Sequence, residues 1–265
     1  MTEGPTHGPR RPAEPQSGPE SEPGRPRVRL FLEQPLGEGQ PLVLPAPAAH
    51  YLAAVMRMPQ GAEVAVFNGR DGEWRARIEQ LAKKAGALRC LRQTAPQTDP
   101  PDLWLLFAPL KKARTDFLVE KATELGVARI VPVGTAFTNA ERVRRDRLQA
   151  HAVEAAEQCG ATHVPTVEEL RPLARMLADW PGERALYWAD ETLAGAAAIQ
   201  PPPGPAAILI GPEGGFSPDE RTRLEALPFV RKLALGPRIL RAETAAVAAI
   251  TLWQAAVGDW ADAGA

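Results

Sequence analysis

Two loops near the C-terminus combine the residue types that can hold a ligand and carry out chemistry. The first, 211–215, reads GPEGG and follows the apolar run 206–210, and the second, 236–241, reads GPRILR and follows the run 232–235. Glycines permit positive φ angles and let a ligand approach the backbone closely. In open α/β sheets, ligands collect beyond the carboxyl ends of the strands. The two loops therefore predict one shared ligand site.

The composition of the first loop excludes some classes of ligand but does not identify the ligand. The loop lacks the lysine and the hydroxyl residue of a phosphate-binding P-loop, and its glycines do not have the spacing of the dinucleotide fingerprint. Glu213 places a carboxylate inside the loop, which argues against a polyphosphate because like charges repel. A ligand that is cationic or rich in hydrogen-bond donors suits the loop better, and the residues alone leave its identity open.

The segments around the two loops predict the elements that position them. The five apolar residues 206–210 are typical of a strand that is buried on both faces of a parallel sheet. Ser217, Pro218 and Glu220 predict a helix that begins with a capping box. A second predicted helix, 242–256, is apolar nearly all round, which indicates burial in the core or in a subunit interface.

The two loops and their surroundings resemble a known family. The segments LIGPEGGFSPDE and LALGPRILRAETA closely resemble the two signature segments of the RsmE family, which methylates N3 of a uridine in 16S ribosomal RNA with S-adenosyl-L-methionine. The segments RPRVRLFL, HYLAAVMRMPQGAEVAVFNGRDGEW and KKARTDFLVEKATELGVARIVPV resemble the same family. The resemblance implies an α/β fold: a SPOUT-type C-terminal domain, with a parallel sheet flanked by helices and a trefoil knot, after a small N-terminal PUA-like β-barrel.

The resemblance also implies the cofactor, the partners and the site residues. S-adenosyl-L-methionine is the expected cofactor, 16S rRNA of the small ribosomal subunit the expected substrate, and a homodimer the expected assembly, with the last helix near the interface. The residues expected to bind the cofactor come from both loops and their edges: Leu209, Gly211, Pro212, Glu213, Gly214, Gly215, Leu235, Gly236, Ile239 and Leu240.

The second loop also supplies the candidates for catalysis. Uridine N3 is a poor nucleophile until its proton leaves, so a good site combines a base with positive charge near the ring oxygens. Arg238 and Arg241 are candidates for stabilising the uridine anion or for holding a flanking phosphate. Glu243 is a candidate for orienting one of these arginines or for acting as the base, and equally for a carboxylate that interacts with the helix dipole. Glu213 is open to a similar structural interpretation, as a brace of its own loop.

The rest of the chain divides by composition. Residues 1–24 are rich in proline, glycine and charge, which predicts a disordered tail. Residues 25–96 hold short alternating runs separated by turn signals such as Asn68-Gly69, which predicts the small RNA-binding β-barrel. After a proline-containing linker, residues 103–260 begin with a β-α-β pattern, which predicts the methyltransferase domain.

Positive charge is concentrated in two places. Residues 25–92 contain eleven basic and six acidic residues in a chain of net charge −1, which suits contact with an RNA backbone as well as it suits a solvated barrel face. A second arginine-rich run precedes the helix that ends in AVEAAEQCG, and it is either a phosphate-contacting strip or a solvated face. The candidate RNA contacts are Arg27, Arg29, Arg57, Arg142, Arg144 and Arg145.

Several function classes are disfavoured. No apolar run approaches the roughly 20 residues that cross a bilayer, and the N-terminus has no apolar segment of a signal peptide, so a cytoplasmic protein without membrane contact is expected. Cys90, Cys159 and four scattered histidines lack metal-ligand spacing, so no metal is expected.

Two alternatives to the family's own reaction stay open. EQCG is normally followed by an arginine in the family, whereas this chain has Ala161, which puts in doubt any substrate contact of that arginine. One alternative is a SPOUT methyltransferase that acts on another RNA, which the resemblance through 27–78 disfavours. The other is a non-catalytic RNA-binding protein, which the two intact loops disfavour.

Overall fold

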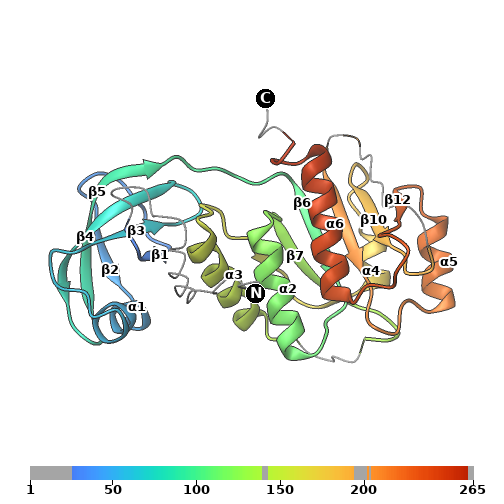
Figure 1. Ribbon diagram of the computed structural model, residues 1–265, viewed down its shortest axis with the longest axis horizontal. Coiled ribbons are helices and arrows are strands. Elements are labelled where there is room, and N and C mark those ends of the chain that lie inside the picture. The colour runs from blue at the N-terminus through green and yellow to red at the C-terminus, as the bar shows by residue number, and fades with distance from the viewer. Residues whose placement is uncertain (1–25, 139–142, 194–201, 203, 262–265) are drawn as a thin grey trace, which may run out of the picture.

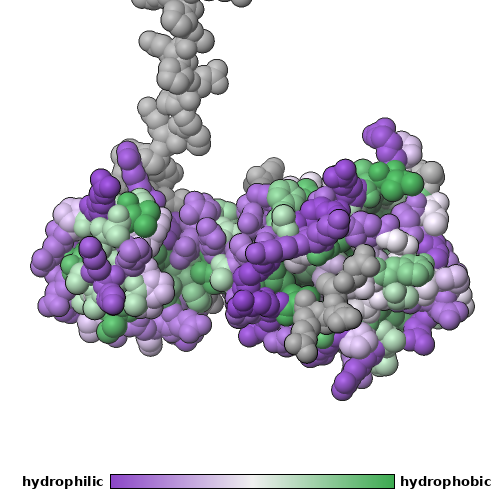
Figure 2. Space-filling model, turned by 90° about the horizontal axis from the view of Figure 1, so that it is seen from below, coloured by the Kyte–Doolittle hydropathy of each residue, from purple (hydrophilic) through white to green (hydrophobic). Residues whose placement is uncertain are grey.

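The computed structural model describes residues 26–138, 143–193, 202 and 204–261. The predicted tail, 1–24, lies outside these residues. Figure 1 shows an N-terminal β unit and a larger C-terminal α/β unit, which the extended segment 96–102 connects. In the space-filling view of Figure 2 the two units form two lobes that meet at a narrow waist.

The N-terminal unit is a five-stranded sheet in the order β1-β3-β4-β5-β2. Alternating apolar residues, among them Leu42, Leu44, Val64 and Val66, are buried in one cluster, so the prediction of short half-buried strands is confirmed. The elements are β1 (Arg29–Phe31), β2 (Pro41–Leu44), the helix α1 (Ala46–His50), the π-helical turn η1 (Tyr51–Val55), β3 (Glu63–Phe67), β4 (Glu73–Leu81) and β5 (Gly86–Ala95).

The helical segment of this unit runs from Ala46 to Val55, through α1 and η1. Pro47 lies in the first turn of α1, where its fixed φ and missing N–H fit the start of a helix. Arg57 has φ 50°, a left-handed conformation that a helix interior does not tolerate, and Pro59, two residues later, disfavours a helical conformation of Met58. Local backbone chemistry thus set these boundaries.

The C-terminal unit contains a seven-stranded sheet with the path β12-β10-β11-β6-β7-β8, and β9 pairs with β7. All of its strand pairs are parallel, so the predicted parallel sheet is confirmed. Its strands are β6 (Leu103–Phe107), β7 (Arg129–Gly134), β8 (Thr166–Val167), β9 (Arg171–Pro172), β10 (Ala185–Ala189), β11 (Ala206–Ile210) and β12 (Val230–Leu233). Its helices are α2 (Lys112–Glu124), α3 (Arg145–Cys159), α4 (Leu173–Ala178), α5 (Pro218–Ala226) and α6 (Ala242–Val257).

Helices cover both faces of this sheet (Figure 1). Because successive strand side chains point to opposite faces, Leu105 and Ile208 pack with α2, α3 and α6, whereas Leu106 and Leu209 pack with α4 and α5. All five residues of β11 are buried, as predicted for a central parallel strand. The trefoil knot stays a prediction, since the order and pairing of the strands do not test how the chain is threaded.

Two element boundaries and one short helix differ from the expectations. Strand β12 ends at Leu233, so Leu235 belongs to the loop that follows it. Arg145 lies inside α3 rather than before it. Helix α4 was not predicted, because six residues are too few to show a helical period. Within the described part of the chain, no helix is long and apolar enough to cross a membrane.

Candidate functional site

The carboxyl ends of three neighbouring parallel strands, β10, β11 and β12, meet at one edge of the sheet. A cavity of about 250 Å³ opens at this edge, between the chain that follows β10, the GPEGG loop and the start of α6. A second, smaller cavity of about 50 Å³ adjoins it and is bounded by the loop that follows β12. The structure therefore brings the two predicted loops together at one site.

Most of the predicted cofactor residues line these two cavities. Those on the larger cavity are Gly211, Pro212, Glu213, Gly215, Ile239 and Leu240. Those on the smaller cavity are Leu235, Gly236, Ile239 and Leu240. Ile239 and Leu240 are shared, so the second loop forms the partition between the two spaces. Ile239 is also 85% exposed, which is unusual for a large apolar side chain.

Two predicted cofactor residues are elsewhere. The side chain of Leu209 is fully buried and packs in one cluster with Trp188 and Phe216, and Leu209 lines neither cavity, so its assignment to cofactor binding stays a prediction. The side chain of a hydrophobic residue at the end of a central strand usually packs in the core. The sequence alone does not reveal on which face of the sheet it lies. Gly214 lines neither cavity, and a Cβ there would lie 3.2 Å from Cβ of Phe137.

Glycine is required at two positions of the first loop. A Cβ on Gly215 would lie 2.6 Å from Oε1 of Glu191, and its φ of +69° disfavours other residues. A Cβ on Gly211 would lie 2.7 Å from the ring of Phe216. A side chain on Gly215 would displace Glu191 from the cavity wall, and one on Gly211 would displace the Phe216 ring, so the two glycines permit the close packing around this loop.

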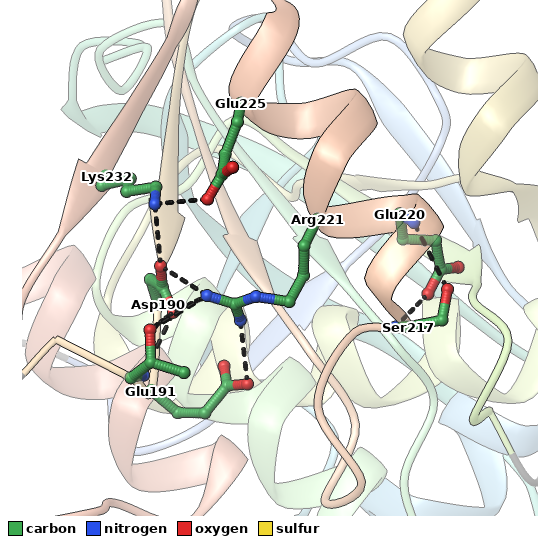
Figure 3. Close-up of polar contacts among 8 residues, drawn as sticks. Asp190, Glu191, Ser217, Glu220, Arg221, Glu225 and Lys232 are labelled. Carbon is green, nitrogen blue, oxygen red and sulfur yellow. Dashed lines mark hydrogen bonds and ion pairs between the residues drawn. The ribbon is translucent and has the colours of Figure 1, made fainter.

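The residues after β10 form a part of the site that was not assigned from the sequence. Asp190 and Glu191 line the smaller cavity, and Glu191 also lines the larger one. Arg221 of α5 donates hydrogen bonds to both Asp190 carboxylate oxygens at 2.8 and 2.9 Å and forms an ion pair with Glu191 at 3.3 Å (Figure 3). The available indication is their position directly after the parallel strand β10, at the edge of the sheet where ligands collect.

Asp190 is the buried centre of this network. Its side chain is fully buried, and Lys232 lies 3.5 Å from it on the other side while also contacting Glu225 (Figure 3). Burial would raise the pKa of the Asp190 carboxyl, but hydrogen bonds from Arg221 and Thr192 outweigh that effect and lower it. The carboxylate is therefore charged and fixes the chain at the cavity mouth.

The start of α5 holds the other side of the GPEGG loop through the predicted capping box, which is confirmed. Ser217 Oγ accepts from the Glu220 backbone N–H, and Glu220 Oε2 accepts from the Ser217 N–H at 2.9 Å (Figure 3). The other Glu220 oxygen accepts from the Ala136 N–H at 2.8 Å, which ties α5 to the loop after β7.

We expect Ser217→Ala to lower the free energy of unfolding by about 1 kcal/mol, because an orphan N–H at the helix start loses its acceptor. Urea denaturation measures the change. The control is Thr222→Ala, whose exposed hydroxyl contacts a backbone carbonyl of the same helix and whose loss should cost less than about 0.5 kcal/mol. Equal losses in the two variants would contradict the role of the cap.

Arg114 of α2 joins the first loop to the start of α6 and was also missed from the sequence. Its guanidinium forms a short ion pair with Glu213 of the first loop, and Nη1 lies 3.8 Å from Glu243 Oε2 at the start of α6. Glu243 is largely buried, and this oxygen accepts no hydrogen bond from the described residues. The arginine that contacts Glu243 is thus Arg114, not Arg238 or Arg241 as hypothesised.

The guanidinium groups of Arg238 and Arg241 have no polar partner among the described residues. Arg241 lines the larger cavity and is the N-cap residue of α6, and Arg238 lines the smaller cavity. Both are exposed, and neither guanidinium forms a hydrogen bond or an ion pair within the described chain. Two unpaired cations at a cavity mouth are available to an anionic ligand.

The arginines predicted to contact RNA differ in their exposure and in their partners. Arg27 and Arg57 are exposed on the N-terminal unit. Arg144 is exposed and pairs with Asp146, Arg145 is exposed and donates to the Val167 carbonyl, and Arg142 lies outside the described residues.

The prediction for Arg29 as an RNA contact is wrong. Its side chain is only 7% exposed, and its donors are engaged by Glu73 and by backbone carbonyls of the C-terminal unit. Its position in the basic, alternating segment gave no sign of this burial. For the described residues, no group of three or more His, Cys, Asp or Glu side chains is arranged to hold a metal ion.

Comparisons with known proteins agree with this geometry. Residues 97–254 match the model of an RNA methyltransferase domain, and residues 44–89 match that of an RNA methyltransferase PUA domain. The ribosomal RNA small subunit methyltransferase E of Rickettsia conorii is 28% identical over 230 residues, covering 84% of this chain and 93% of that protein. The protein of the same name from Bacillus subtilis is 26% identical over 242 residues, covering 84% of this chain and 94% of that protein.

Solved structures show the same fold. The ribosomal RNA small subunit methyltransferase E of Neisseria gonorrhoeae, bound to S-adenosyl methionine, is 30% identical with a TM-score of 0.79, over 88% of this chain and 99% of that chain. A Legionella pneumophila protein in complex with the same cofactor is 30% identical with a TM-score of 0.78, over 88% and 98%. The predicted combination of a SPOUT-type α/β domain with a PUA-like N-terminal domain is confirmed. Because the methyltransferase model matches more than half of the sequence, this chain belongs to the RNA methyltransferase family that includes the proteins named ribosomal RNA small subunit methyltransferase E.

Proposed function

We propose that the protein uses S-adenosyl-L-methionine to methylate N3 of a specific uridine in the 16S rRNA of the small ribosomal subunit. The observation that carries the proposal is the convergence of the two family loops on one cavity with the unpaired Arg241 at its wall. The units 25–96 and 103–260 then act as the RNA-binding and methyltransferase domains. We expect the protein to work in the cytoplasm, where ribosomal subunits are assembled.

The cavity residues fit the proposed cofactor. Adenosine and methionine moieties offer ribose hydroxyls, an amino group and a sulfonium, which are cationic or donate hydrogen bonds. Glu191 and Glu213 supply carboxylates at the wall, Gly211 and Gly215 leave backbone groups open, and Ile239 supplies apolar surface. When bound, the cofactor supplies an electrophilic methyl group. The protein's own task is to align the acceptor and to raise its nucleophilicity.

The two unpaired arginines fit the second part of that task. Removal of the N3 proton places negative charge on the uracil oxygens, and a guanidinium donates charge-assisted hydrogen bonds to such atoms. Arg241 lines the larger cavity beside Gly211, and Arg238 lines the adjoining smaller one. We assign to Arg241 the stabilisation of the uridine anion and to Arg238 the same role or a contact to the flanking phosphate.

Glu243 is better assigned as a positioning residue than as the base. It faces Arg114, which also pairs with Glu213, so the three side chains link α2 to the first loop and to the start of α6. Glu243 itself lines neither cavity. Its carboxylate at the start of α6 is in addition favourably placed relative to the helix dipole.

We expect Glu243→Gln to lower kcat by less than about tenfold, because the amide keeps the size and a weaker contact to Arg114, whereas loss of a general base costs roughly 10²- to 10⁴-fold. The pH dependence of kcat should keep the shape that the wild type shows. Steady-state kinetics across pH measure both. A loss of two orders of magnitude, with the loss of one limb of the pH profile, would identify Glu243 as the base instead.

The RNA partner and the assembly complete the proposal. N3 lies on the Watson–Crick edge, so the target uridine must leave any base pair before it enters the cavity. The exposed Arg27, Arg57, Arg144 and Arg145 are proposed to hold the surrounding backbone. We propose a homodimer that covers Ile239 and the partly exposed face of α6. Light scattering tests it, and a monomeric mass would contradict it.

The decisive experiment is methyl transfer from labelled S-adenosyl-L-methionine to small ribosomal subunits from a strain that lacks the corresponding gene. Mass spectrometry of the digested RNA should find 3-methyluridine in 16S rRNA. Label on another base or another RNA would contradict the substrate assignment. No label on any RNA, together with no cofactor binding in calorimetry, would favour a non-catalytic RNA-binding protein.

A further inference from the structure

Arg29 of the N-terminal unit is buried between the two halves of the molecule. Its Nε donates to Glu73 Oε2 at 2.6 Å within the N-terminal sheet, and the guanidinium carbon lies 4.4 Å from the centre of the Phe67 ring. The remaining nitrogens point across the boundary. Nη1 donates to the carbonyls of Ala156 at 2.6 Å and Glu157 at 3.0 Å, and Nη2 donates to that of Ala161 at 3.0 Å.

The acceptors lie on what we call the docking segment, 156–162, which contains the last turn of α3 and the residues after it. The final carbonyls of a helix have no partner inside the helix and carry partial negative charge, so they favour a cation. Gly160, at φ 84°, ends the helix and turns the Ala161 carbonyl toward the same guanidinium.

Two further contacts join the same segment to the N-terminal half. The Phe31 N–H donates to Glu157 Oε1 at 2.8 Å, so the free edge of β1 is covered by the end of α3. The Thr98 N–H of the connecting segment donates to Thr162 Oγ1 at 3.0 Å. The paired residues lie more than sixty positions apart in the sequence, and every acceptor belongs to the seven residues of the docking segment.

We propose that Arg29 is a positioning residue that locks the N-terminal unit onto the docking segment and so fixes the RNA-binding surface relative to the catalytic cavity. An arginine suits this task because its planar fork reaches acceptors on both units at once, which the single ammonium of a lysine cannot do. The effect on methylation rests on the proposed function. The docking itself does not.

The geometry predicts how undocking acts on turnover. If only a fraction of molecules holds the two units in register, the apparent affinity for a substrate that touches both falls by that fraction. Cofactor affinity is unaffected, because none of the cavity residues belongs to the N-terminal unit or to the docking segment. Once the substrate is bound in register, the chemical step is unchanged.

The test compares the full-length wild type with Arg29→Lys, and with Arg89→Lys as the matched control. Arg89 lies in the same sheet, where it pairs with Glu79 at the surface. Arg29→Lys also weakens a buried contact to Glu73, so a second variant changes the docking segment instead. Glu157→Ala removes the acceptor of the Phe31 N–H. Its control is Glu154→Ala, an exposed carboxylate one turn earlier in α3.

Hydrogen exchange of the Phe31 amide and the radius of gyration from small-angle scattering report whether the two units are docked. Calorimetry reports the cofactor affinity, and steady-state kinetics report the KM for small ribosomal subunits. In Arg29→Lys and Glu157→Ala we expect faster Phe31 exchange, a larger radius, and a KM about tenfold higher if the docked fraction falls to about a tenth. The expected kcat and cofactor Kd are those of the wild type, and the controls should match the wild type throughout.

Unchanged exchange and radius in both variants would overturn the docking role. Altered docking with an unchanged KM would overturn the positioning role. If the wild type methylates no RNA, the proposed function fails, while exchange and scattering still decide whether Arg29 docks the two units.

Discussion

Replacing Arg241 with alanine is expected to lower kcat for methyl transfer by roughly 10²- to 10³-fold, the usual effect of removing a donor that stabilises developing negative charge. Arg241 lines the larger cavity and forms no ion pair within the described chain, so its charge is available to the substrate. The affinity for S-adenosyl-L-methionine should change little, because Gly211, Gly215 and Glu191 still form the cavity wall. Calorimetry and single-turnover kinetics on small ribosomal subunits separate the two quantities.

Two further variants test this assignment: Arg241→Lys as an intermediate case and Arg223→Ala as the control. The lysine keeps the charge but loses the planar fork, so an intermediate kcat is expected. Arg223 is an exposed arginine of α5 outside both cavities, and its replacement should leave kcat at the wild-type value. A wild-type kcat for Arg241→Ala would contradict the assigned role. An equal loss of cofactor affinity would assign Arg241 to cofactor binding instead.

The second large effect is expected at Asp190. Asp190→Asn should lower the free energy of unfolding near neutral pH by about 2 to 3 kcal/mol, because it leaves Arg221 without the fully buried carboxylate that it contacts. The expected loss stays at the lower end for buried pairs because Arg221 is partly exposed and keeps Glu191. The cofactor affinity should fall as well, since Glu191 follows directly and lines both cavities.

The sign of the pH dependence follows from the lowered pKa of Asp190. A carboxyl whose pKa is lower in the folded state stabilises that state fully above its unfolded value of about 3.9, and the contribution is lost as the pH falls through the folded value. The gap between the wild type and Asp190→Asn should therefore be constant near neutrality and shrink below about pH 4. Urea denaturation over this range measures it.

Asp179→Asn is the matched control for this experiment. Asp179 is an exposed carboxylate at the end of α4, so its replacement should cost less than about 0.5 kcal/mol at every pH. A gap for Asp190→Asn that stays the same in acid would contradict the stabilising role of the carboxylate charge.

The sequence determined those features that depend on neighbouring residues. The apolar run at Ala206–Ile210 became a buried strand, Ser217 and Glu220 formed the capping box, and α6 began at Ala242. Each of these rests on local periodicity or on hydrogen bonds that span a few residues, which one segment of chain specifies by itself. The two ligand loops were recognisable for the same reason, since their glycines and charges are contiguous.

Only the tertiary structure decided which residues share a site. Arg114 meets Glu213 across about a hundred positions of sequence, Glu191 enters the cavity from a strand that had no assigned role, and Leu209 turns away into the core. Arg29 looked like one of several basic surface residues, yet burial and three distant carbonyls make it part of a contact between the two units. The physical reason is that sheet order and helix packing set the direction and burial of each side chain. They bring together segments that are far apart in the sequence, and the separation in sequence does not reveal which segments will meet.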